Sequence, residues 1–550
     1  MAGEARLSWE LERLEDRKRW WVRDDLYTLE PRTPLSADVY NHFWNEQALW
    51  IAEKMSVPDS KGFNVITVNG YTYLGPLEVT DEDLVRERAQ VFQARLEALI
   101  RDVEVDIPRY RSEQETALAG WKGMDLSRRT AMELLESWRQ VVLTLDRFYK
   151  IHFLIVFPRH VVTGMLHEIA RDAAGIQSQA EIGKLVQSMG VTRQLHLDMG
   201  LWRLAAAVIA LGLRDTFLNN SAEALGPMLR VDVEGRAWWE KLDEFLAEDG
   251  GRLIVPKELS SPTWQEHPVP VLETIRMFVG LGAVFDFDGL QKDQTAEREQ
   301  VVDAALARLR DGKERGRFEQ LLGMAQRLQV AMEDDNFYVL NMGGQVRRVA
   351  LEIGRRLTAS AALGHPEDVF FLHHHEVESL LTDSVTGIYA VSEVRGLVSE
   401  RRALRTAQRA SKPPAYLGSP PQEIHHFLLN NFWGIRDLGQ LRDEGRVISG
   451  IGASDGTAEG IARVVLQADE LKRVQGGEIL VVPATNPAWT PIFSKISGVV
   501  TDQGGSLSHA AIVAREYGIP AVLGTQNGTQ RIPDGARVRV DGRKGEVEIL

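Results

Sequence analysis

The sequence predicts a multidomain chain: a mainly α-helical part with a small N-terminal β element, followed by a C-terminal α/β domain. Three observations predict this fold class. Apolar residues recur at helical spacing over most of residues 81–440, an Asn-Gly pair separates two β-type runs within residues 65–73, and short β-type runs separated by glycine and proline fill residues 448–550. Because 550 residues are too many for one hydrophobic core, we expect several folding units.

The N-terminal β element is predicted to be a hairpin. Residues 65–68 read Val-Ile-Thr-Val and residues 71–73 read Tyr-Thr-Tyr, with Asn69-Gly70 between them. Both central positions of a type I′ turn need a positive φ, and Asn-Gly supplies it at low cost. We therefore expect two antiparallel strands joined by this pair.

The helical part is predicted from seven stretches with apolar residues at helical spacing. These stretches are residues 84–103, 128–152, 161–173, 199–213, 296–309, 316–332 and 345–362. Breaks are expected at Gly250-Gly251, in the loop 256–270 and at the prolines of 412–421. The expected boundaries are 1–440 for the helical part, 441–447 for a short charged linker and 448–550 for the α/β domain.

Composition excludes several classes of protein. The chain has no cysteine, hence no disulfide framework or thiolate metal site. A net charge of -14 argues against nucleic-acid and anionic-membrane partners. The first 25 residues are too charged for a signal peptide, and the most apolar run, 201–213, is short and interrupted by Arg203. We expect a soluble, cytoplasmic protein.

The most informative stretch is residues 498–524, where a β-type run ends in Gly504-Gly505 and a helix is expected to begin at His509. Adjacent glycines let an anion approach the backbone closely. Ser508 is a favourable N-cap, and the first turn of a helix presents unpaired N–H groups and the positive end of its dipole. Near neutral pH an imidazole nitrogen can attack phosphorus, so we predict a phosphohistidine. A surface or half-buried structural histidine is the alternative.

This stretch resembles the mobile phosphohistidine domain of phosphoenolpyruvate-utilising enzymes. The resemblance is carried by Thr501-Asp502, Gly504-Gly505, Ser508-His509, 511–516, 518–522 and Gly524, with further similarity at 460–465 and 483–491. It implies a swivelling α/β domain with His509 as phosphoryl carrier. The loop residues that it implies are Thr501, Gly504, Gly505, Ser506, Ser508 and Arg515. Thr501 would hold the imidazole ring and Arg515 would steady the phosphate, although an Arg-Glu pair on the helix surface is an equal alternative.

The first 440 residues resemble the acceptor domain of rifampin phosphotransferases at 31–36, 69–73 and 366–372 with Glu376. The sequence has no P-loop or kinase motif, and we find no room in it for a nucleotide-binding domain. It is therefore similar to phenylphosphate and alkylphenol phosphate synthases, in which that domain is a separate polypeptide. The resemblance implies an ATP-grasp partner subunit that binds ATP and Mg²⁺, phosphorylates His509 and releases AMP and phosphate. This chain would hold no permanent cofactor.

A carrier that is loaded at one site and emptied at another needs a hinge, and residues 441–447 are the candidate. A fixed loop is the alternative. The acceptor implied by the resemblance is a small phenol or alkylphenol, whose site needs an apolar slot, a base and cations near the phosphoryl group. Candidate acceptor-site residues are His152, Glu333, Arg347 and His374, with His160, Arg348, His373 and His375 as further candidates. Each of them also has an ordinary structural interpretation.

Two further expectations concern metal and acceptor. The consecutive histidines 373–375 lack the spacing that brings two ligands to one helix face, and the same holds for His425-His426, so we predict no metal site. Residues 333–336 read Glu-Asp-Asp-Asn where rifampin-type members carry Arg-Glu and Lys, which disfavours rifampin itself. A regulatory carrier that phosphorylates another protein, and a subunit of an antibiotic phosphotransferase, remain open as alternatives.

Overall fold

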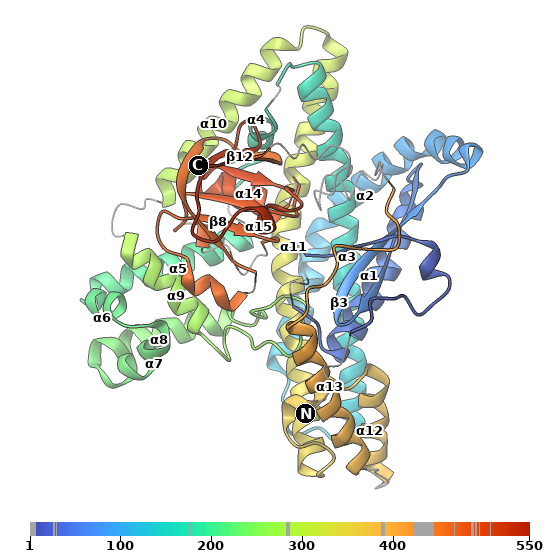
Figure 1. Ribbon diagram of the computed structural model, residues 1–550, viewed down its shortest axis with the longest axis vertical. Helices are drawn as coiled ribbons and strands as arrows, with labels where there is room; N and C mark the ends of the chain where they lie inside the picture. Colours follow the sequence, from blue (N-terminus) through green and yellow to red (C-terminus); the bar gives the residue numbers. More distant parts are fainter. Residues whose placement is uncertain are drawn as a thin grey trace. The chain divides into compact units, whose positions relative to one another are not determined.

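The described part of the chain forms two compact units, each built from segments that are distant in sequence (Figure 1). The computed structural model describes residues 7–25, 28, 30–176, 178–190, 192–281, 287–386, 391–421, 445–466, 468–485, 489, 492, 493, 495–505 and 508–550. The first unit comprises Met1–Leu154, Gly250–Glu266 and Asp335–Pro420. The second unit comprises Ile155–Asp249, His267–Asp334 and Pro421–Leu550.

The first unit contains a four-stranded antiparallel sheet in the order β2-β3-β1-β4. Its strands are β1 (Trp21–Arg23), β2 (Ser60–Val68), β3 (Tyr71–Glu78) and β4 (Tyr416–Leu417). Asn69 and Gly70 join β2 to β3 with φ angles of 49° and 78°, which is the positive pair that a type I′ turn requires. The predicted hairpin is therefore confirmed.

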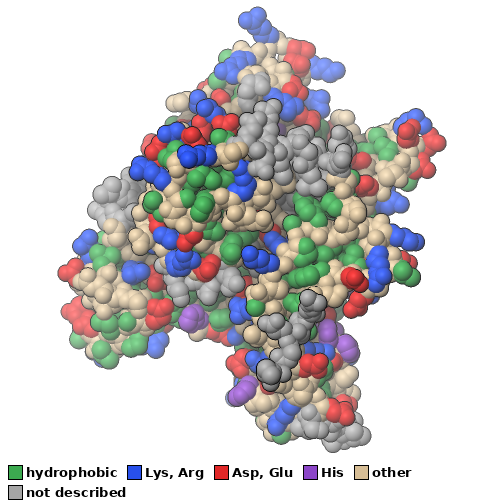
Figure 2. Space-filling view, in the orientation of Figure 1, with side chains coloured by type: hydrophobic (Ala, Val, Ile, Leu, Met, Phe, Trp, Pro, Cys, Tyr) green, Lys and Arg blue, Asp and Glu red, His purple; other side chains and the backbone are tan. Residues whose placement is uncertain are grey.

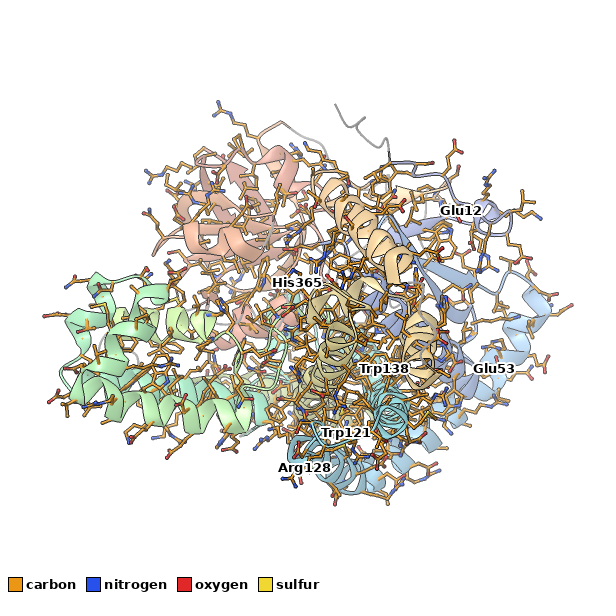
Figure 3. The ribbon with its side chains drawn as sticks, turned by 90° about the horizontal axis from the view of Figure 1, so that it is seen from below. Glu12, Glu53, Trp121, Arg128, Trp138 and His365 are labelled. Carbon is orange, nitrogen blue, oxygen red and sulfur yellow. The ribbon has the colours of Figure 1, made fainter. Side chains whose placement is uncertain are left out.

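Long helices make up the rest of the first unit. They are α1 (Pro34–Met55), α2 (Glu82–Gly123), the first part of α3 (Ala131–Asp172), the last part of α11 (Gly312–Ala359), α12 (His374–Thr386) and α13 (Val391–Arg409). The Asp81 carboxylate caps α2 by accepting from the backbone N–H groups of Asp83 and Leu84. Trp121 and Trp138, on α2 and α3, are buried in this helical layer (Figure 3).

Helices α3 and α11 are longer than the sequence predicts. Four separate apolar stretches, two in each, are joined into helices that run without a break. Pro158 lies inside α3, where it removes one backbone hydrogen bond. Buried residues on both sides of it, such as Phe157 and Val162, keep the helix packed, so tertiary burial outweighs the local break.

Seven further helices belong to the second unit. They are α4 (Gln179–Lys184), α5 (Arg193–Ala210), α6 (Arg214–Asn219), α7 (Ala222–Val231), α8 (Val233–Asp249), α9 (Val269–Leu281) and α10 (Phe287–Arg308). Side chains cap three of them: Ser178 accepts from the Glu181 N–H at the start of α4, Thr192 accepts from the Leu195 N–H at the start of α5, and Asp232 accepts from the Gly235 N–H at the start of α8. The caps at Ser178 and Thr192 fix where α4 and α5 begin.

The C-terminal α/β domain is built on an eight-stranded sheet in the order β5-β12-β11-β7-β8-β9-β10-β6. The strands are β5 (Val447–Ser449), β6 (Ile451–Ser454), β7 (Thr457–Val464), β8 (Ile479–Val482), β9 (Gly498–Thr501), β10 (Ala521–Leu523), β11 (Arg537–Asp541) and β12 (Glu546–Ile549). Strands β7, β8, β9 and β10 pair in parallel, and the outer pairs are antiparallel. The strands confirm the prediction of short β-type runs in this part of the chain.

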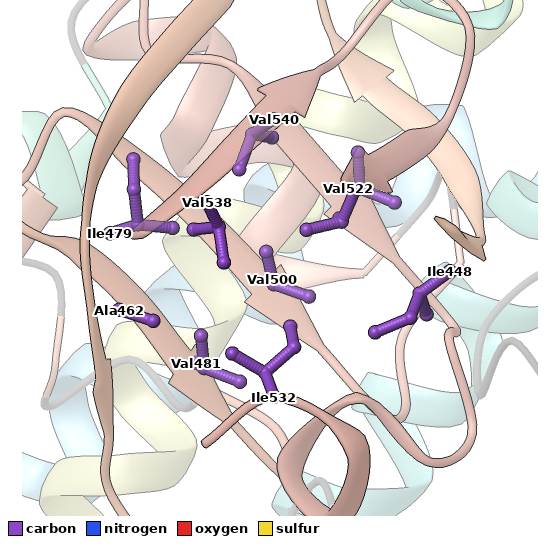
Figure 4. Packing of buried hydrophobic residues seen from close by; sticks show 10 residues of the cluster. Ile448, Ala462, Ile479, Val481, Val500, Val522, Ile532, Val538 and Val540 are labelled. Carbon is purple, nitrogen blue, oxygen red and sulfur yellow. The ribbon is translucent and has the colours of Figure 1, made fainter. Parts of the chain in front are cut away.

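Buried aliphatic side chains form the core of this domain (Figure 4). Val481, Val500 and Val522 come from three neighbouring parallel strands and pack with Val538 and Val540 of β11. Helices α14 (His509–Glu516) and α15 (Gly528–Arg531) complete the domain. The predicted fold class is thus confirmed, from helical part and small β element to C-terminal α/β domain.

The two compact units do not coincide with the expected segments 1–440, 441–447 and 448–550. Residues 1–440 contribute to both units, and the candidate linker 441–447 lies mostly outside the described residues. The acceptor-binding role of the first segment and the hinge therefore stay predictions. Within the described residues, no helix combines the length and the hydrophobicity that a membrane span requires. On the face in Figure 2, acidic and basic side chains are interspersed.

Candidate phosphohistidine site

The loop after β9 is held by hydrogen bonds before α14 begins. The hydroxyl of Thr501 donates to the carbonyl of Gln503 at 2.6 Å, and the hydroxyl of Thr525 donates to the carbonyl of Thr501 at 2.9 Å. Gly504 has a φ of 119°, and a Cβ there would lie 3.1 Å from the Ser508 hydroxyl. A glycine is thus required at this position for both conformation and space. The predicted role of Thr501 toward the imidazole stays a prediction.

Helix α14 begins at His509, as predicted. Ser508 occupies the N-cap position with extended backbone angles, φ -72° and ψ 162°. Its hydroxyl is buried and, among the described residues, makes no hydrogen bond, so it does not cap the helix. Gly518, with a φ of 64°, follows the last turn and ends the helix as expected. Ser506 and the side chain of His509 are outside the described part of the structure.

A pocket in the second unit is lined by residues that follow His509 along α14. Ile512 and Arg515 lie one and two turns into the helix, and both line the pocket. The empty space between the lining residues, including open solvent at its mouth, is about 500 Å³. The remaining lining residues are Arg159 of α3, Gly183 of α4, residues 186–190, Thr192, Leu195, Gln291 of α10, and Gln329 and Glu333 of α11. The pocket therefore joins the C-terminal domain to helices α3, α4, α10 and α11 of the same unit.

One wall of the pocket is a chain of polar side chains. The Nε of Arg159 donates to the amide oxygen of Gln329 at 2.9 Å. The amide nitrogen of Gln329 donates to a carboxylate oxygen of Glu333 at 2.7 Å. Burial raises the pKa of Glu333, although Gln329, Thr192 and Arg159 pull it back in part. Glu333 is thus a carboxyl group that binds a proton more readily than an exposed one.

Positive charge gathers in the same pocket. Arg159 and Arg515 are both buried, at 1% and 8% exposure. Burial, and then the charge of Arg515, lower the pKa of Arg159 to about 9, so its guanidinium keeps its charge at neutral pH. Burial lowers the pKa of His167 on α3 to about 3, with Arg515 as the next cause, so its imidazole is neutral there. A pocket with two guanidinium groups favours an anion.

The other predicted acceptor-site residues lie elsewhere, in the first unit. His152 pairs with Asp335 at 2.7 Å, and Arg347 binds Glu266 at 2.8 Å. The ring of His374 lies 5.5 Å from that of Trp138, and its Nε2 lies 3.6 Å from Glu378. Glu333 is therefore the only one of the four candidates that lines the described pocket.

The further candidates also have defined environments. His160 is buried on α3, where its Nδ1 contacts the carbonyl of Val156. Arg348 donates to the carbonyl of Met124 at 2.9 Å. The Nδ1 of His373 lies 3.0 Å from Asp38, and the His373 and His375 rings stack. In the described ranges no three His, Asp or Glu side chains are grouped to hold a metal ion. His425-His426 lie outside those ranges.

Sequence reasoning missed Arg159, Gln329, Thr192 and His167. A signal for Arg159 exists, because it interrupts the apolar stretch 151–166 of α3, where a charged side chain must be buried. Gln329 and Thr192 carry no such signal. They join the site only because α11 and the start of α5 come together in the fold.

Two family models match the chain, and they match the two sides of this pocket. Residues 474–545 match the model described as "PEP-utilising enzyme, mobile domain", and residues 153–333 match the model described as "Rifampicin phosphotransferase fourth domain". The chain is therefore similar to PEP-utilising enzymes in its C-terminal domain and to rifampicin phosphotransferases in residues 153–333. We call residues 153–333 the fourth-domain region below.

Curated relatives agree with this assignment. The chain is 32% identical to a rifampicin phosphotransferase of Streptomyces sviceus over 61% of this chain and 36% of that protein. It is 30% identical to the uncharacterized phosphotransferase YvkC of Bacillus subtilis, over 76% of this chain and 50% of the relative. It is also 30% identical to the chondramide synthase cmdD of Chondromyces crocatus, over 98% of this chain and 14% of that protein. The chain thus spans half or less of the length of these relatives.

Proposed function

We propose that this chain carries a phosphoryl group on His509 and transfers it to the hydroxyl group of a small phenol or alkylphenol. The observation that supports this most is the position of His509 at the start of α14, whose next two turns supply Ile512 and Arg515 to the pocket. Arg159 and Arg515 provide positive charge for the phosphoryl group, and Glu333 provides a proton acceptor. The relatives' names add support for phosphoryl transfer.

In the proposed transfer step, the acceptor oxygen attacks phosphorus and the P–N bond to His509 breaks. The bonding electron pair returns to the imidazole, which becomes ready for another cycle. The hydroxyl proton passes to the ionised carboxylate of Glu333, whose raised pKa makes it a stronger base than an exposed glutamate. Arg159 and Arg515 stabilise the negative charge on the phosphoryl oxygens as it is transferred.

Loading of His509 is proposed to take place on an ATP-grasp partner subunit. That partner would bind ATP and Mg²⁺, and the overall reaction would convert ATP, water and the acceptor into AMP, inorganic phosphate and the phosphate ester. In the part of this chain that the structure describes, no grouped His, Asp and Glu side chains fit a metal ion. We therefore derive no step of the mechanism through a metal on this chain.

A small aromatic acceptor is supported by the apolar side of the pocket. Val186, Met189, Leu195 and Ile512 line the same pocket as the polar chain, which gives the pocket a mixed character. Rifampicin is the second candidate acceptor, because rifampicin phosphotransferases are among the relatives. The two differ greatly in size, so a panel of phenols and rifampicin separates them directly.

The test of the function uses the chain together with its ATP-grasp partner, with ATP labelled at the β-phosphate. We expect acid-labile label on His509 and its transfer to a phenol. Label that moves to another protein instead would contradict the proposal, as would ester formation by the His509→Ala variant. Formation of rifampicin phosphate without any phenyl phosphate would favour the second candidate.

A further inference from the structure

Within the second unit, the C-terminal α/β domain, whose described residues 445–550 are called the mobile domain below, contacts the fourth-domain region through α4 and α10. The hydroxyl of Ser178, the N-cap of α4, donates to a carboxylate oxygen of Asp455 at 3.4 Å, and Lys184 Nζ lies 3.9 Å from the other oxygen. The side-chain amide of Gln294 on α10 donates to the carbonyl of Arg515 at 3.1 Å. These three polar contacts surround the place where Arg515 enters the pocket.

Gly183 is the residue that makes this contact close. A Cβ added at Gly183 would lie 2.2 Å from Nη1 of Arg515 and 2.7 Å from its Cζ, so the guanidinium rests against the bare backbone of α4. Glycine is unfavourable inside a helix, by about 0.5–1 kcal/mol relative to alanine. Its presence here is explained by the space that Arg515 needs.

The contact brings like charges together. Arg515 reaches the pocket in which Arg159 is already buried, and its charge disfavours the charged form of both Arg159 and His167. Gln329 links Arg159 to Glu333, whose carboxyl group is itself driven by burial toward its neutral form. The pocket therefore has an excess of positive charge, and a doubly negative group entering it would turn a repulsive contact into an attractive one.

We propose that this contact is an anion-dependent docking site: the mobile domain binds the fourth-domain region through Arg515 and Gly183, and a phosphoryl dianion in the pocket strengthens the binding. The inference rests on the proposed function for its natural anion, which is the phosphoryl group on His509. Docking would then depend on whether the carrier is loaded. An empty carrier would leave the docking site more easily and become available for reloading.

The chain offers a clean test because it contains no cysteine. The pair Ser178→Cys and Asp455→Cys places two thiols where two side-chain oxygens lie 3.4 Å apart, so oxidised glutathione should form a disulfide when the mobile domain is docked. The pair Ser178→Cys and Asp534→Cys is the control, because Asp534 pairs instead with Arg463 and Arg473. The rate of disulfide formation then reports the docked fraction.

The anion used is inorganic phosphate, compared with chloride at equal ionic strength. We expect phosphate near twice its dissociation constant to raise the ratio of docked to undocked protein about threefold, by simple linkage, and the trapping rate to rise with the docked fraction. Arg159→Gln should remove this increase, and Arg159→Lys should retain part of it. Equal rates in phosphate and chloride would overturn the proposal, as would a full phosphate effect in a folded Arg159→Gln protein.

Gly183→Ala tests the geometry, with Gly316→Ala as the matched control. Both are helical glycines of the second unit, but a Cβ at Gly316 meets nothing within 4 Å. We expect Gly183→Ala to slow trapping and Gly316→Ala to leave it unchanged. Unchanged trapping in Gly183→Ala would show that Arg515 does not dock against α4.

A last comparison tests the docking site separately from the proposed role of His509 as the source of the anion. Phosphoramidate phosphorylates histidine without any partner protein, so treated protein freed of reagent should also trap faster, and the His509→Ala protein should not. Free phosphate should still act on His509→Ala. If free phosphate speeds trapping but phosphoramidate treatment does not, the docking site is supported and His509 is contradicted as the source of the anion. If neither speeds trapping, the docking site itself is contradicted.

Discussion

Two buried places in this chain, the carboxylate of Glu258 in the first unit and the pocket in the second, hold their charged side chains differently. In the first unit, Glu258 accepts hydrogen bonds from the backbone and hydroxyl of Thr33 and from the hydroxyls of Ser36 and Ser260. Burial opposes its ionisation, yet Arg405 and these donors lower its pKa. In the second unit, Arg159 and Glu333 line a pocket together with Arg515, and burial there lowers the pKa of Arg159 and raises the pKa of Glu333, which disfavours the charged form of each.

This difference indicates which charges serve the fold and which serve the chemistry. A buried carboxylate with many donors is preorganised and contributes to stability through its hydrogen bonds. Charges held in an environment that disfavours them cost stability, and such sites are enriched in function. Substitutions at Glu258 and at Glu333 should accordingly have opposite consequences for stability and activity.

The largest expected effect is a loss of phosphoryl transfer when Glu333, in the pocket of the second unit, is replaced. Glu333→Gln should lower the rate of transfer to the acceptor at least about 100-fold, because it removes the proposed base. The folded protein should be as stable as before or more stable, since burial disfavours the ionised carboxylate that is removed. Single-turnover transfer from loaded protein and thermal melts measure both. The control is Glu319→Gln on the exposed side of the same helix, where an unchanged rate is expected.

If Glu333→Gln transferred the phosphoryl group at the rate of the parent, the acceptor would have to be bound elsewhere. The buried pair His152 and Asp335 in the first unit would then be the next candidate.

In the first unit the expected effect is on stability. Glu258→Gln should lower the free energy of unfolding by about 2–3 kcal/mol, because an amide cannot accept from all the donors around it. Phosphorylation of His509 should survive at temperatures where the variant is folded. Urea denaturation measures this loss of stability. The control is Glu46→Gln, at an exposed position of α1, whose free energy of unfolding should lie within about 0.5 kcal/mol of the parent's. A loss of activity without a loss of stability would contradict the structural role.

Local chemistry explains what could be predicted from the sequence. The turn at Asn69-Gly70 and the helix beginning at His509 depend on a few adjacent residues, and both are found where expected. The continuity of α3 through Pro158 was not predictable, because it depends on burial against distant segments. The pocket was not predictable as a whole, since it gathers residues from α3, α4, α10, α11 and α14.

A smaller effect is expected from pH in the second unit. His167 is buried with its pKa lowered to about 3, against about 6.5 in an unfolded chain. Below pH 6.5 the unfolded chain therefore takes up a proton that the folded state does not, and stability falls as pH decreases. Between pH 6.5 and 5 the loss should be about 2 kcal/mol. Denaturation of parent and His167→Gln proteins at pH 7 and 5 measures it, and an equal loss in both would contradict the assignment.

The smallest effect is expected from the contact between α1 and α12 in the first unit. Asp38 raises the pKa of His373, and His373 in turn helps to lower the pKa of Asp38 against burial. The stability of this pair is lost as pH rises through the raised pKa of His373, and also as pH falls through the lowered pKa of Asp38. Both side chains are partly exposed, so the contribution should stay below about 1 kcal/mol. A double-mutant cycle with Asp38→Asn and His373→Gln at pH 5.5 and 8 measures it, and a coupling that grows with pH would contradict the assignment.

The imidazole of His509 is proposed to carry the phosphoryl group between two sites. This role is tested most directly by mass spectrometry of the working complex, quenched at alkaline pH so that phosphohistidine survives. The account predicts a phosphoryl group on His509 during turnover, lost when the acceptor is added in excess and ATP is exhausted. Continued formation of the phosphate ester with His509 unmodified throughout would contradict it.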